Sequence, residues 1–260
     1  MKFFSIICMF IANSCFAQQW QAEVMAGVSG YNGDLTQSYV SFKTMRPAVN
    51  LNLKYLMPNE FIVLRAGIGY GFISGNDKNN KDPGIVTRNL NFKSHILEGS
   101  FCVEVNLFKP DRFEGLPYLF AGVGVFHYDP FTKDKNNNKT YLRPLGTEGQ
   151  GLAAYPDRKM YSLTQFCLPF GGGWKLRFNE KYEIIYELGF RYLFTDYLDD
   201  VSTSYANPQT LLAQRGPTAV ELAYRQINPS VAKEGNQRGN PKAKDWYYMT
   251  GVKLLIKLGE

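Results

Sequence analysis

Cysteine, histidine and long hydrophobic runs are scarce in this sequence. Its 260 residues contain four cysteines and two histidines, and two of the cysteines lie in the N-terminal segment. The remaining two, Cys102 and Cys167, are too few for a disulfide-stabilised scaffold, and we expect both thiols to be free. The formal charge is +6, but lysine and arginine form no run, which argues against a nucleic-acid partner.

The N-terminus has the features of a secretory signal peptide. Lys2 precedes an apolar run from Phe3 to Ala12, and small residues lead to Ala17. This pattern predicts a signal peptide over residues 1–17. No later stretch approaches the ~18 apolar residues of a membrane-spanning helix. A secreted chain without such a helix is either a soluble protein or a β-barrel.

The main signal in the rest of the chain is an alternation of apolar and polar residues with a period of two. In QWQAEVMAGVSG (19–30), apolar residues occupy every second position from Trp20, and Gln, Glu, Met, Gly and Ser stand between them. Each run of this kind has roughly the 9–11 residues with which a tilted strand crosses a bilayer. The eight runs are residues 19–30, 46–57, 61–74, 91–108, 117–128, 164–178, 182–194 and 245–257.

Short and long connections alternate between these runs. The short ones are residues 57–60, 109–116 and 178–181, and the long polar ones are 31–45, 75–90, 129–163 and 192–244. This alternation is typical of outer-membrane barrels, in which periplasmic turns are short and extracellular loops are long. We therefore predict an all-β fold over residues 18–260: an eight-stranded antiparallel transmembrane β-barrel that crosses the cell outer membrane several times.

A soluble eight-stranded barrel is the competing fold, and it would turn its apolar face inward around a ligand. The polar face argues against it, because glycines and charges of both signs suit a narrow interior, whereas lipid demands an apolar exterior. We expect the interior charges to pair, since an unpaired buried charge costs several kcal/mol. Eight strands leave room only for side chains, so no pore is expected. The predicted interior network comprises Glu23, Lys54, Arg65, Glu98, Glu104, Lys175, Arg177, Glu183, Glu187, Arg191 and Lys253.

Three carboxylates follow the seventh run, in the stretch FTDYLDDVSTSY (194–205). Asx-turns and capping at a strand exit account for aspartates at such a place. The alternative is a calcium ion bound by Asp196, Asp199 and Asp200. Their spacing is not the Asp-x-Asp-x-Asp-Gly of a dedicated calcium loop.

The histidines leave an enzyme as a further alternative. His95 opens the fourth run and His127 ends the fifth, so either could lie at a barrel rim, and His127 or Asp199 could take part in catalysis there. A single rim histidine is more often an interface residue than a base. We therefore expect no enzyme, no cofactor and no small-molecule substrate.

Six stretches carry a resemblance to one family. They are YNGDL (31–35), RNLNFKSHILEGS (88–100), PYLFAGVGVFHYDP (117–130), PLGTEGQGLAAYPDRKMYSLTQ (144–165), FTDYLDDVSTSY (194–205) and NQRGNPKAKDWYYM (236–249). Together they resemble the PorG-type outer-membrane β-barrels of the type IX secretion system, over essentially the whole mature chain. The family-motif residues in the loops are Tyr31, Gly33, Asp34, Pro144, Gly146, Gly151, Asp199 and Asp200.

The resemblance implies a structural component of the protein secretion and gliding motility machinery. Such a barrel sits in outer-membrane lipid and lipopolysaccharide and contacts periplasmic ring proteins of the PorK and PorN type. The resemblance implies no catalytic or cofactor residues. The alternative is a general structural barrel like OmpA, which has the same fold without those partners.

Overall fold

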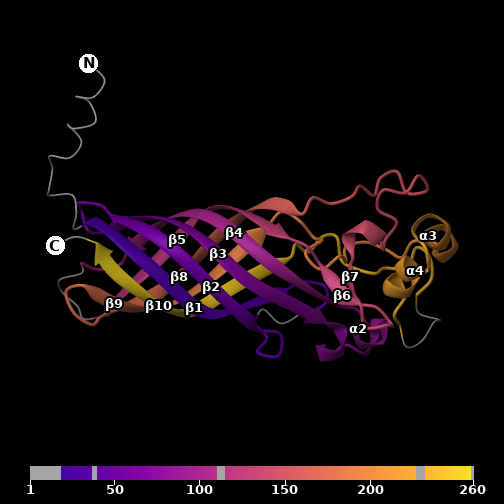
Figure 1. The fold of residues 1–260 in the computed structure, drawn as a ribbon, viewed down its shortest axis with the longest axis horizontal. Coiled ribbons are helices and arrows are strands. Elements are labelled where there is room, and N and C mark those ends of the chain that lie inside the picture. The colour runs from indigo at the N-terminus through magenta and orange to yellow at the C-terminus, as the bar shows by residue number, and fades with distance from the viewer. Residues whose placement is uncertain (1–18, 37–39, 110–114, 227–231, 259–260) are drawn as a thin grey trace, which may run out of the picture.

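Eight long antiparallel strands form a closed barrel (Figure 1). The structure is a computed structural model that describes residues 19–36, 40–109, 115–226 and 232–258, so the predicted signal peptide lies outside the described residues. Each strand pairs with the next along the chain, and β10 pairs with β1 to close the barrel. The strands are β1 (Trp20–Asn32), β2 (Arg46–Leu56), β3 (Ile62–Asn76), β4 (Asn91–Asn106), β5 (Gly115–Tyr128), β8 (Thr164–Arg177), β9 (Tyr182–Leu193) and β10 (Trp246–Leu258).

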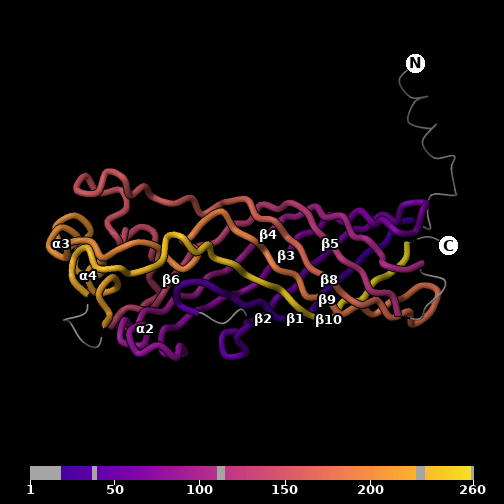
Figure 2. Tube along the Cα trace, turned by 180° about the vertical axis from the view of Figure 1, so that it is seen from behind, coloured from indigo at the N-terminus to yellow at the C-terminus, as the bar shows by residue number. Residues whose placement is uncertain are grey.

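The short turns lie at one end of the barrel, with Trp20 and Leu258, and the long loops lie at the other (Figures 1 and 2). The predicted eight-stranded barrel, with its alternation of short turns and long loops, is thereby confirmed. The loops contain η2 (Asp77–Asn79), α2 (Pro83–Arg88), β6 (Phe131–Lys133), β7 (Lys139–Tyr141), η3 (Arg143–Leu145), α3 (Pro208–Arg215) and α4 (Pro217–Ala223). Within the described residues, no helix has the length and apolar character needed to cross a membrane.

Several strands continue past their predicted ends. β1 reaches Asn32 and β3 reaches Asn76, where Asn76 pairs with Asn91, although residues 31–32 and 75–76 were expected to be loop. Strand pairing uses backbone groups, so it continues towards the loop end beyond the residues whose side chains are apolar. The barrel wall is therefore taller at the loop end than the hydrophobic alternation indicates.

Side chains alternate between the wall's two faces as the period of two predicts. Outward positions are exposed and apolar, as at Leu51, Ile68 and Phe166. Inward positions are buried and mostly polar or glycine. At Gly67, a Cβ atom would lie 1.9 Å from Oδ1 of Asn52, so the crowded interior requires glycine there.

An aromatic layer fills the barrel between the charged interior and the loop end. Tyr161 stacks on Tyr128 and Tyr197, with ring centroids 6.2 Å and 4.9 Å apart. Phe126 and Tyr247 lie in the same buried cluster. The aromatic layer separates the interior charges from the polar loops above.

The two cysteines are free and buried inside the barrel. Cys102 on β4 and Cys167 on β8 lie on either side of β5, opposite Gly122 and Gly124. A Cβ atom at either glycine would lie within 2.9 Å of the neighbouring sulfur. The intervening strand keeps the thiols apart, and its glycines make room for them.

Candidate functional site

Seven charged side chains form one connected cluster in the half of the barrel nearer the short turns, which we call the charge network. Its members are Glu23, Lys54, Arg65, Glu104, Lys175, Glu187 and Lys253. Glu104 lies at its centre. One of its carboxylate oxygens is 2.9 Å from both Lys54 Nζ and Arg65 Nη1, and the other is 3.3 Å from Lys175 Nζ.

Two further carboxylates complete the charge network. Glu187 Oε2 lies 2.6 Å from Arg65 Nη1 and 2.7 Å from Lys253 Nζ. Lys253 Nζ also lies 2.8 Å from Glu23, which pairs with Lys54 as well. Each carboxylate thus contacts at least two cations, so the low-dielectric interior contains no isolated charge in this cluster.

The other four predicted interior residues fall into two groups. Glu98 accepts hydrogen bonds from Arg191 Nε at 2.8 Å and from Tyr247 at 2.6 Å, higher in the barrel. Arg177 is exposed, and Glu183, whose side chain is 13% exposed, pairs with Lys257 at 3.3 Å. Because β8 and β9 extend below the packed interior, these last two side chains lie outside the charge network.

The loops opposite the turns assemble into a second buried polar structure, which we call the cap. It is built from residues 33–45, 77–90, 129–163 and 194–245, as far as the structure describes them (Figure 1). Six carboxylates in the cap are buried, and Asp34, which is half-buried, joins the same loops. These cap carboxylates are Asp34, Asp77, Glu148, Asp196, Asp199, Asp200 and Asp245.

Asp199 and Asp200 tie the cap to the barrel. Asp199 accepts a short hydrogen bond from the hydroxyl of Tyr31 at the end of β1. Asp200 accepts hydrogen bonds from Thr147 at 2.6 Å and from Tyr161 at 2.8 Å. Asp200 has a φ of 68°, a left-handed conformation that aspartate tolerates better than most residues. The adjacent aspartates therefore point to different partners from a sharp backbone turn.

Glu148 organises the segment that follows these aspartates. Its two oxygens accept hydrogen bonds from the backbone N–H groups of Ser202 and Thr203 at 3.0 Å and 2.9 Å. Arg238 Nη1 lies 3.0 Å from Glu148 and donates to the Asp200 carbonyl at 2.7 Å. A single buried ion pair therefore holds residues 200–203 against residue 238.

A second ion pair joins the remaining loops. Arg88, at the end of α2, contacts Asp77 through Nε and Nη2, at 2.8 Å and 2.7 Å. The same guanidinium donates to the carbonyls of Asp34, at 2.8 Å, and of Arg238. Arg88 thus links three of the four loops.

Most cap carboxylates are held in an environment that disfavours their charge. Burial raises the pKa of Asp196 to about 7 and the pKa of both Asp34 and Asp200 to about 6. Burial also raises the pKa of Asp199 and Asp245 well above the usual range, and the charges of neighbouring aspartates add to the effect. The cap therefore contains more carboxyl groups than its two buried arginines can neutralise.

Seven of the eight family-motif residues lie in this cap, whereas Tyr31, which was expected in a loop, lies in β1. Gly146 and Gly151 have positive φ values of 55° and 71°, which glycine adopts without strain. A Cβ atom at Gly33 would lie 2.0 Å from Oδ1 of Asp245. Pro144 lies in η3, beside Gly146. The structure thus brings together residues from the loop after β1, the loop after β5 and the loop after β9.

The three carboxylates considered as calcium ligands do not converge. Asp196 accepts a hydrogen bond from Ser202 at 2.7 Å, while Asp199 and Asp200 have the separate partners described above. In the part of the chain that the structure describes, no group of three His, Cys, Asp or Glu residues could hold a metal ion.

The histidines lie on the outside of the barrel wall. His127 Nδ1 is 2.9 Å from the Thr164 hydroxyl, and His95 Nδ1 is 2.5 Å from the Tyr70 hydroxyl. Both rings are exposed, whereas Asp199 is buried within the cap. The structure therefore does not pair His127 with Asp199.

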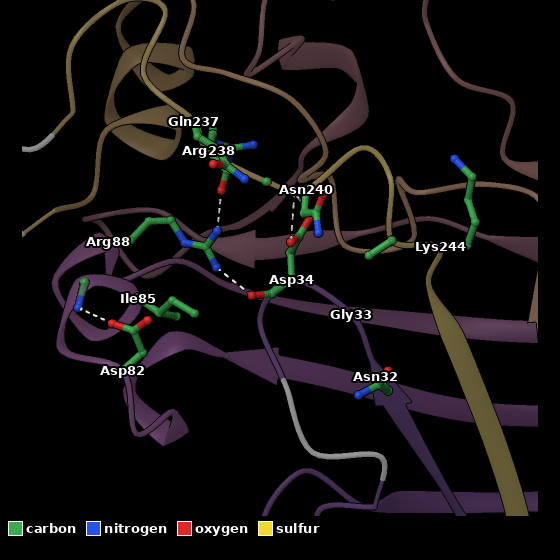
Figure 3. A pocket seen from close by; sticks show the side chains of 13 residues that line it. Asn32, Gly33, Asp34, Asp82, Ile85, Arg88, Gln237, Arg238, Asn240 and Lys244 are labelled. Carbon is green, nitrogen blue, oxygen red and sulfur yellow. Dashed lines mark hydrogen bonds between the residues drawn. The ribbon is translucent and has the colours of Figure 1, made fainter.

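An open cleft of about 640 Å³ indents the side of the cap (Figure 3). Asp34, Arg88 and Arg238 lie along it, together with Asn240 and Lys244. Asp34 accepts hydrogen bonds from the backbone N–H of Asn240 at 3.0 and 3.1 Å. The polar groups at the bottom of the cleft are thus already engaged in joining loops.

Sequence reasoning missed the residues that hold the cap together. Glu148, Arg88, Arg238 and Asp245 all lie inside the stretches that carry the family resemblance, but no local pattern singles them out. Their roles depend on contacts between loops that are far apart in the chain. A buried-charge argument could identify them only once the fold was known.

A family model described as "Domain of unknown function (DUF6089)" matches residues 1–146. No curated protein matches the chain. Among solved structures, Neisserial surface protein A is similar with a TM-score of 0.45 and 9% identity, covering 92% of this chain and 97% of that one. Ail of Yersinia pestis has a TM-score of 0.40 and 8% identity, with 92% and 99% covered. OprG from Pseudomonas aeruginosa has a TM-score of 0.39 and 10% identity, with 94% and 99% covered. Likenesses this weak say nothing about function.

Proposed function

Since this chain belongs to the DUF6089 family, a domain of unknown function, we propose its function from its own geometry: it is a structural β-barrel of the outer membrane. The observation that carries this proposal is the barrel's outer wall. Large apolar side chains are exposed on all eight strands, from Val24 on β1 to Leu254 on β10. Soluble proteins rarely expose apolar patches larger than a few hundred Å², whereas hydrocarbon accommodates such a surface.

The filled interior favours an anchor over a channel. Buried side chains fill the barrel along its length: the charge network towards the short turns and the aromatic layer towards the long loops. An eight-stranded barrel has an interior just wide enough for such filling. We infer that the barrel holds the cap outside the cell and the short turns in the periplasm, and conducts no solute.

Membrane residence can be tested directly. The protein should fractionate with outer membranes, require detergent for extraction, and migrate differently in electrophoresis before and after boiling, as a stable barrel does. External protease should cleave the cap and leave the barrel strands intact. Recovery of the folded mature chain in buffer without detergent would contradict the proposal.

We further propose that this barrel belongs to the type IX secretion machinery and contacts PorK- and PorN-type ring proteins from the membrane. The resemblance of the sequence to PorG-type barrels supports this finer assignment. The short turns supply a surface for this contact. Asn59 and Asn179 each accept hydrogen bonds from two backbone N–H groups, those of the first residue of the next strand and of the residue before it, at 2.8–3.2 Å. Glu60 and Glu180 project beside them at the same end, and both are exposed.

Affinity purification of the detergent-solubilised barrel tests this assignment. Ring proteins should co-purify with the wild type, and the double variant Glu60→Lys/Glu180→Lys should retain less of them. The control is Lys81→Gln/Lys242→Gln, which changes two exposed cap residues. If only lipids and lipopolysaccharide co-purify, the barrel is a general structural one like OmpA and the type IX assignment is wrong.

A further inference from the structure

Basic side chains face outward on one side of the barrel only. Among the eight described barrel strands, outward positions carry three basic residues: Lys93 and His95 on β4, and His127 on β5. On the opposite side the outer strand ends are aromatic, with Tyr192 on β9 and Trp246 on β10. At the loop end of the apolar wall, the basic side chains on outward strand positions therefore lie over β4 and β5, and Lys93 is the cation among them.

A short hairpin extends the wall on the side of β4 and β5. β6 and β7 pair with each other, and β6 pairs with β4 through Lys93 and Phe131 (Figure 1). Phe131 in turn pairs with Tyr141. Lys93, Phe131 and Tyr141 thus stand side by side across three strands, which are spaced roughly 4.8 Å apart. We call the surface formed by Lys93, His95, Phe131, Lys139 and Tyr141 the rim ledge.

Aromatic rings form the base of the rim ledge. His95 stacks on Phe131, with ring centroids 5.9 Å apart, and Phe72 lies 6.2 Å from Phe131. The Tyr70 hydroxyl contacts His95 Nδ1, which fixes the imidazole ring. Below these rings the wall continues with Leu97, whose side chain is 56% exposed. The base of the ledge is therefore continuous with the surface that we propose to face lipid.

A lysine is held in place above these rings. Lys139 Nζ lies 4.0 Å from the centroid of Phe131 and 4.7 Å from that of Tyr141, and it donates to the Tyr141 hydroxyl at 2.9 Å. These contacts leave its ammonium charge unneutralised. Lys93 is exposed, and no ion pair involves it within the described residues.

Two carboxylates lie close to this surface, Asp129 and Asp134, the second in the turn that joins β6 and β7. Asp129 is half-buried and interacts electrostatically with His127, Lys139 and Arg143. Lys93, Lys133 and Lys139 outnumber these two carboxylates, so the ledge keeps a net positive charge. An anion that binds here would therefore gain attraction without having to displace an existing ion pair of Lys93.

We propose that the rim ledge binds the phosphorylated head group of an acylated glycolipid of the outer leaflet. Its phosphates contact Lys93 and Lys139, and an acyl chain lies against Tyr70, Phe72 and Leu97. Ammonium groups bind phosphate as point charges, and aromatic rings are favoured at the level of the head groups. This inference rests on the proposed outer-membrane location, because the phosphorylated glycolipid lies in the outer leaflet of that membrane, beside the apolar wall.

The test uses the full mature barrel, inserted into phosphatidylcholine nanodiscs that contain diphosphorylated lipid A. Native mass spectrometry counts the lipid A retained per barrel as its concentration is varied. The double variant Lys93→Gln/Lys139→Gln should bind lipid A roughly ten- to thirty-fold more weakly than the wild type. Lys139→Arg should retain binding, and the control Lys81→Gln/Lys242→Gln removes two exposed cap charges and should change it less than about two-fold.

Two comparisons separate the possible outcomes. With dephosphorylated lipid A, the wild type should bind no more tightly than the Lys93→Gln/Lys139→Gln variant. Inorganic phosphate at millimolar concentration should not displace the phosphorylated lipid A. Equal binding of the ledge variant and the control, or of lipid A with and without phosphate, would overturn the inference while leaving the membrane barrel intact. Failure of the wild-type barrel to insert, shown by the absence of heat-modifiable migration, would instead overturn the proposed function and this inference with it.

Discussion

The barrel interior and the cap both contain buried charges, but they balance them differently. Inside the barrel, four glutamates face five cations, counting the pair of Glu98 with Arg191. In the cap, the seven cap carboxylates face only two arginines, Arg88 and Arg238, within ion-pair distance in the described loops. The first region satisfies its carboxylates with cations, and the second satisfies them mainly with hydroxyl and backbone N–H donors.

This difference predicts that the stability of the two regions depends differently on pH. A carboxylate paired with several cations keeps its charge, so the barrel interior should be insensitive to pH in the physiological range. A buried carboxyl that only accepts hydrogen bonds from neutral groups is more stable when it holds a proton. The cap should therefore be the part of the molecule that senses pH, and the barrel the part that resists it.

The largest expected effect comes from breaking the balance inside the barrel. Glu104→Leu leaves Lys54, Arg65 and Lys175 with too few carboxylates, so the free energy of unfolding should fall by about 3–5 kcal/mol. Urea unfolding in vesicles, followed by tryptophan fluorescence, measures it. The control Glu180→Gln removes an exposed carboxylate in the turn between β8 and β9 and should cost less than ~1 kcal/mol. Equal losses would mean that the interior network is not the element that stabilises the barrel.

A second comparison concerns the solvent outside each region. Leu51 on β2 and Leu212 on α3 are similarly exposed, at 54% and 52%. Leu51→Arg should destabilise the barrel by about 2–4 kcal/mol, because it places a charge in hydrocarbon. Leu212→Arg faces water and should change stability by less than about 0.5 kcal/mol. Similar effects at both positions would argue that the same solvent surrounds the wall and the cap.

A smaller, local effect is expected from removing a cation of the cap. Arg238→Met leaves Glu148 buried beside Asp200 without a cationic partner, so residues 200–203 should lose about 1–3 kcal/mol of protection. Amide hydrogen exchange should show this loss in the cap and unchanged protection in the barrel strands. Lys159→Met, at an exposed loop position, is the matched control. If Arg238→Met unfolds the whole barrel, the cap is not an independent unit.

The last comparison concerns the pH response of the intact cap. Asp34, Asp196 and Asp200 have folded pKa values of about 6, 7 and 6, against 3.8 for ordinary aspartate. Because the folded cap holds these protons more tightly than the unfolded chain, protonation contributes its full stabilisation below about pH 4. This stabilisation is lost as the pH rises through 6 to 7. Hydrogen exchange, corrected for its intrinsic rate, should show a looser cap at pH 8 than at pH 5.

A variant can assign part of this pH response. Asp196→Asn removes the group with a pKa of about 7 and keeps a side chain that can bond to Ser202. The cap of this variant should lose less protection between pH 6 and pH 8 than the wild type. A response of the barrel strands as large as that of the cap would contradict the contrast between the two regions.

The barrel was predictable from sequence because each strand has one face towards the outside of the barrel and one towards its interior. Lipid outside and a crowded interior inside impose a period of two, which eight runs such as 61–74 display. The same reasoning placed Glu104 and Lys54 inside. It also placed Arg177 inside, although that residue is exposed, because alternation alone does not show where the packed interior ends.

The cap was not predictable, because its contacts join residues far apart in the chain. Tyr31 bonds to Asp199 across 168 positions, and Asn240 bonds to Asp34 across 206. No periodicity connects such residues. Glycine and aspartate favour turns, so turns at Gly146 and Asp200 can be read from the sequence. Which loops these turns contact depends on how the barrel strands position the loops. The hairpin of β6 and β7 was missed because its strands have only three residues each.

The seam between β1 and β10 has a consequence for biogenesis. Trp20 pairs with Leu258, so the first strand to be synthesised must wait for the last before its free edge is covered. An uncovered strand edge is a template for aggregation, and pairing across so great a separation is slow. During that interval β1 must be shielded by a chaperone or by the insertion machinery, and any delay in translating β10 lengthens the time for which this protection is needed.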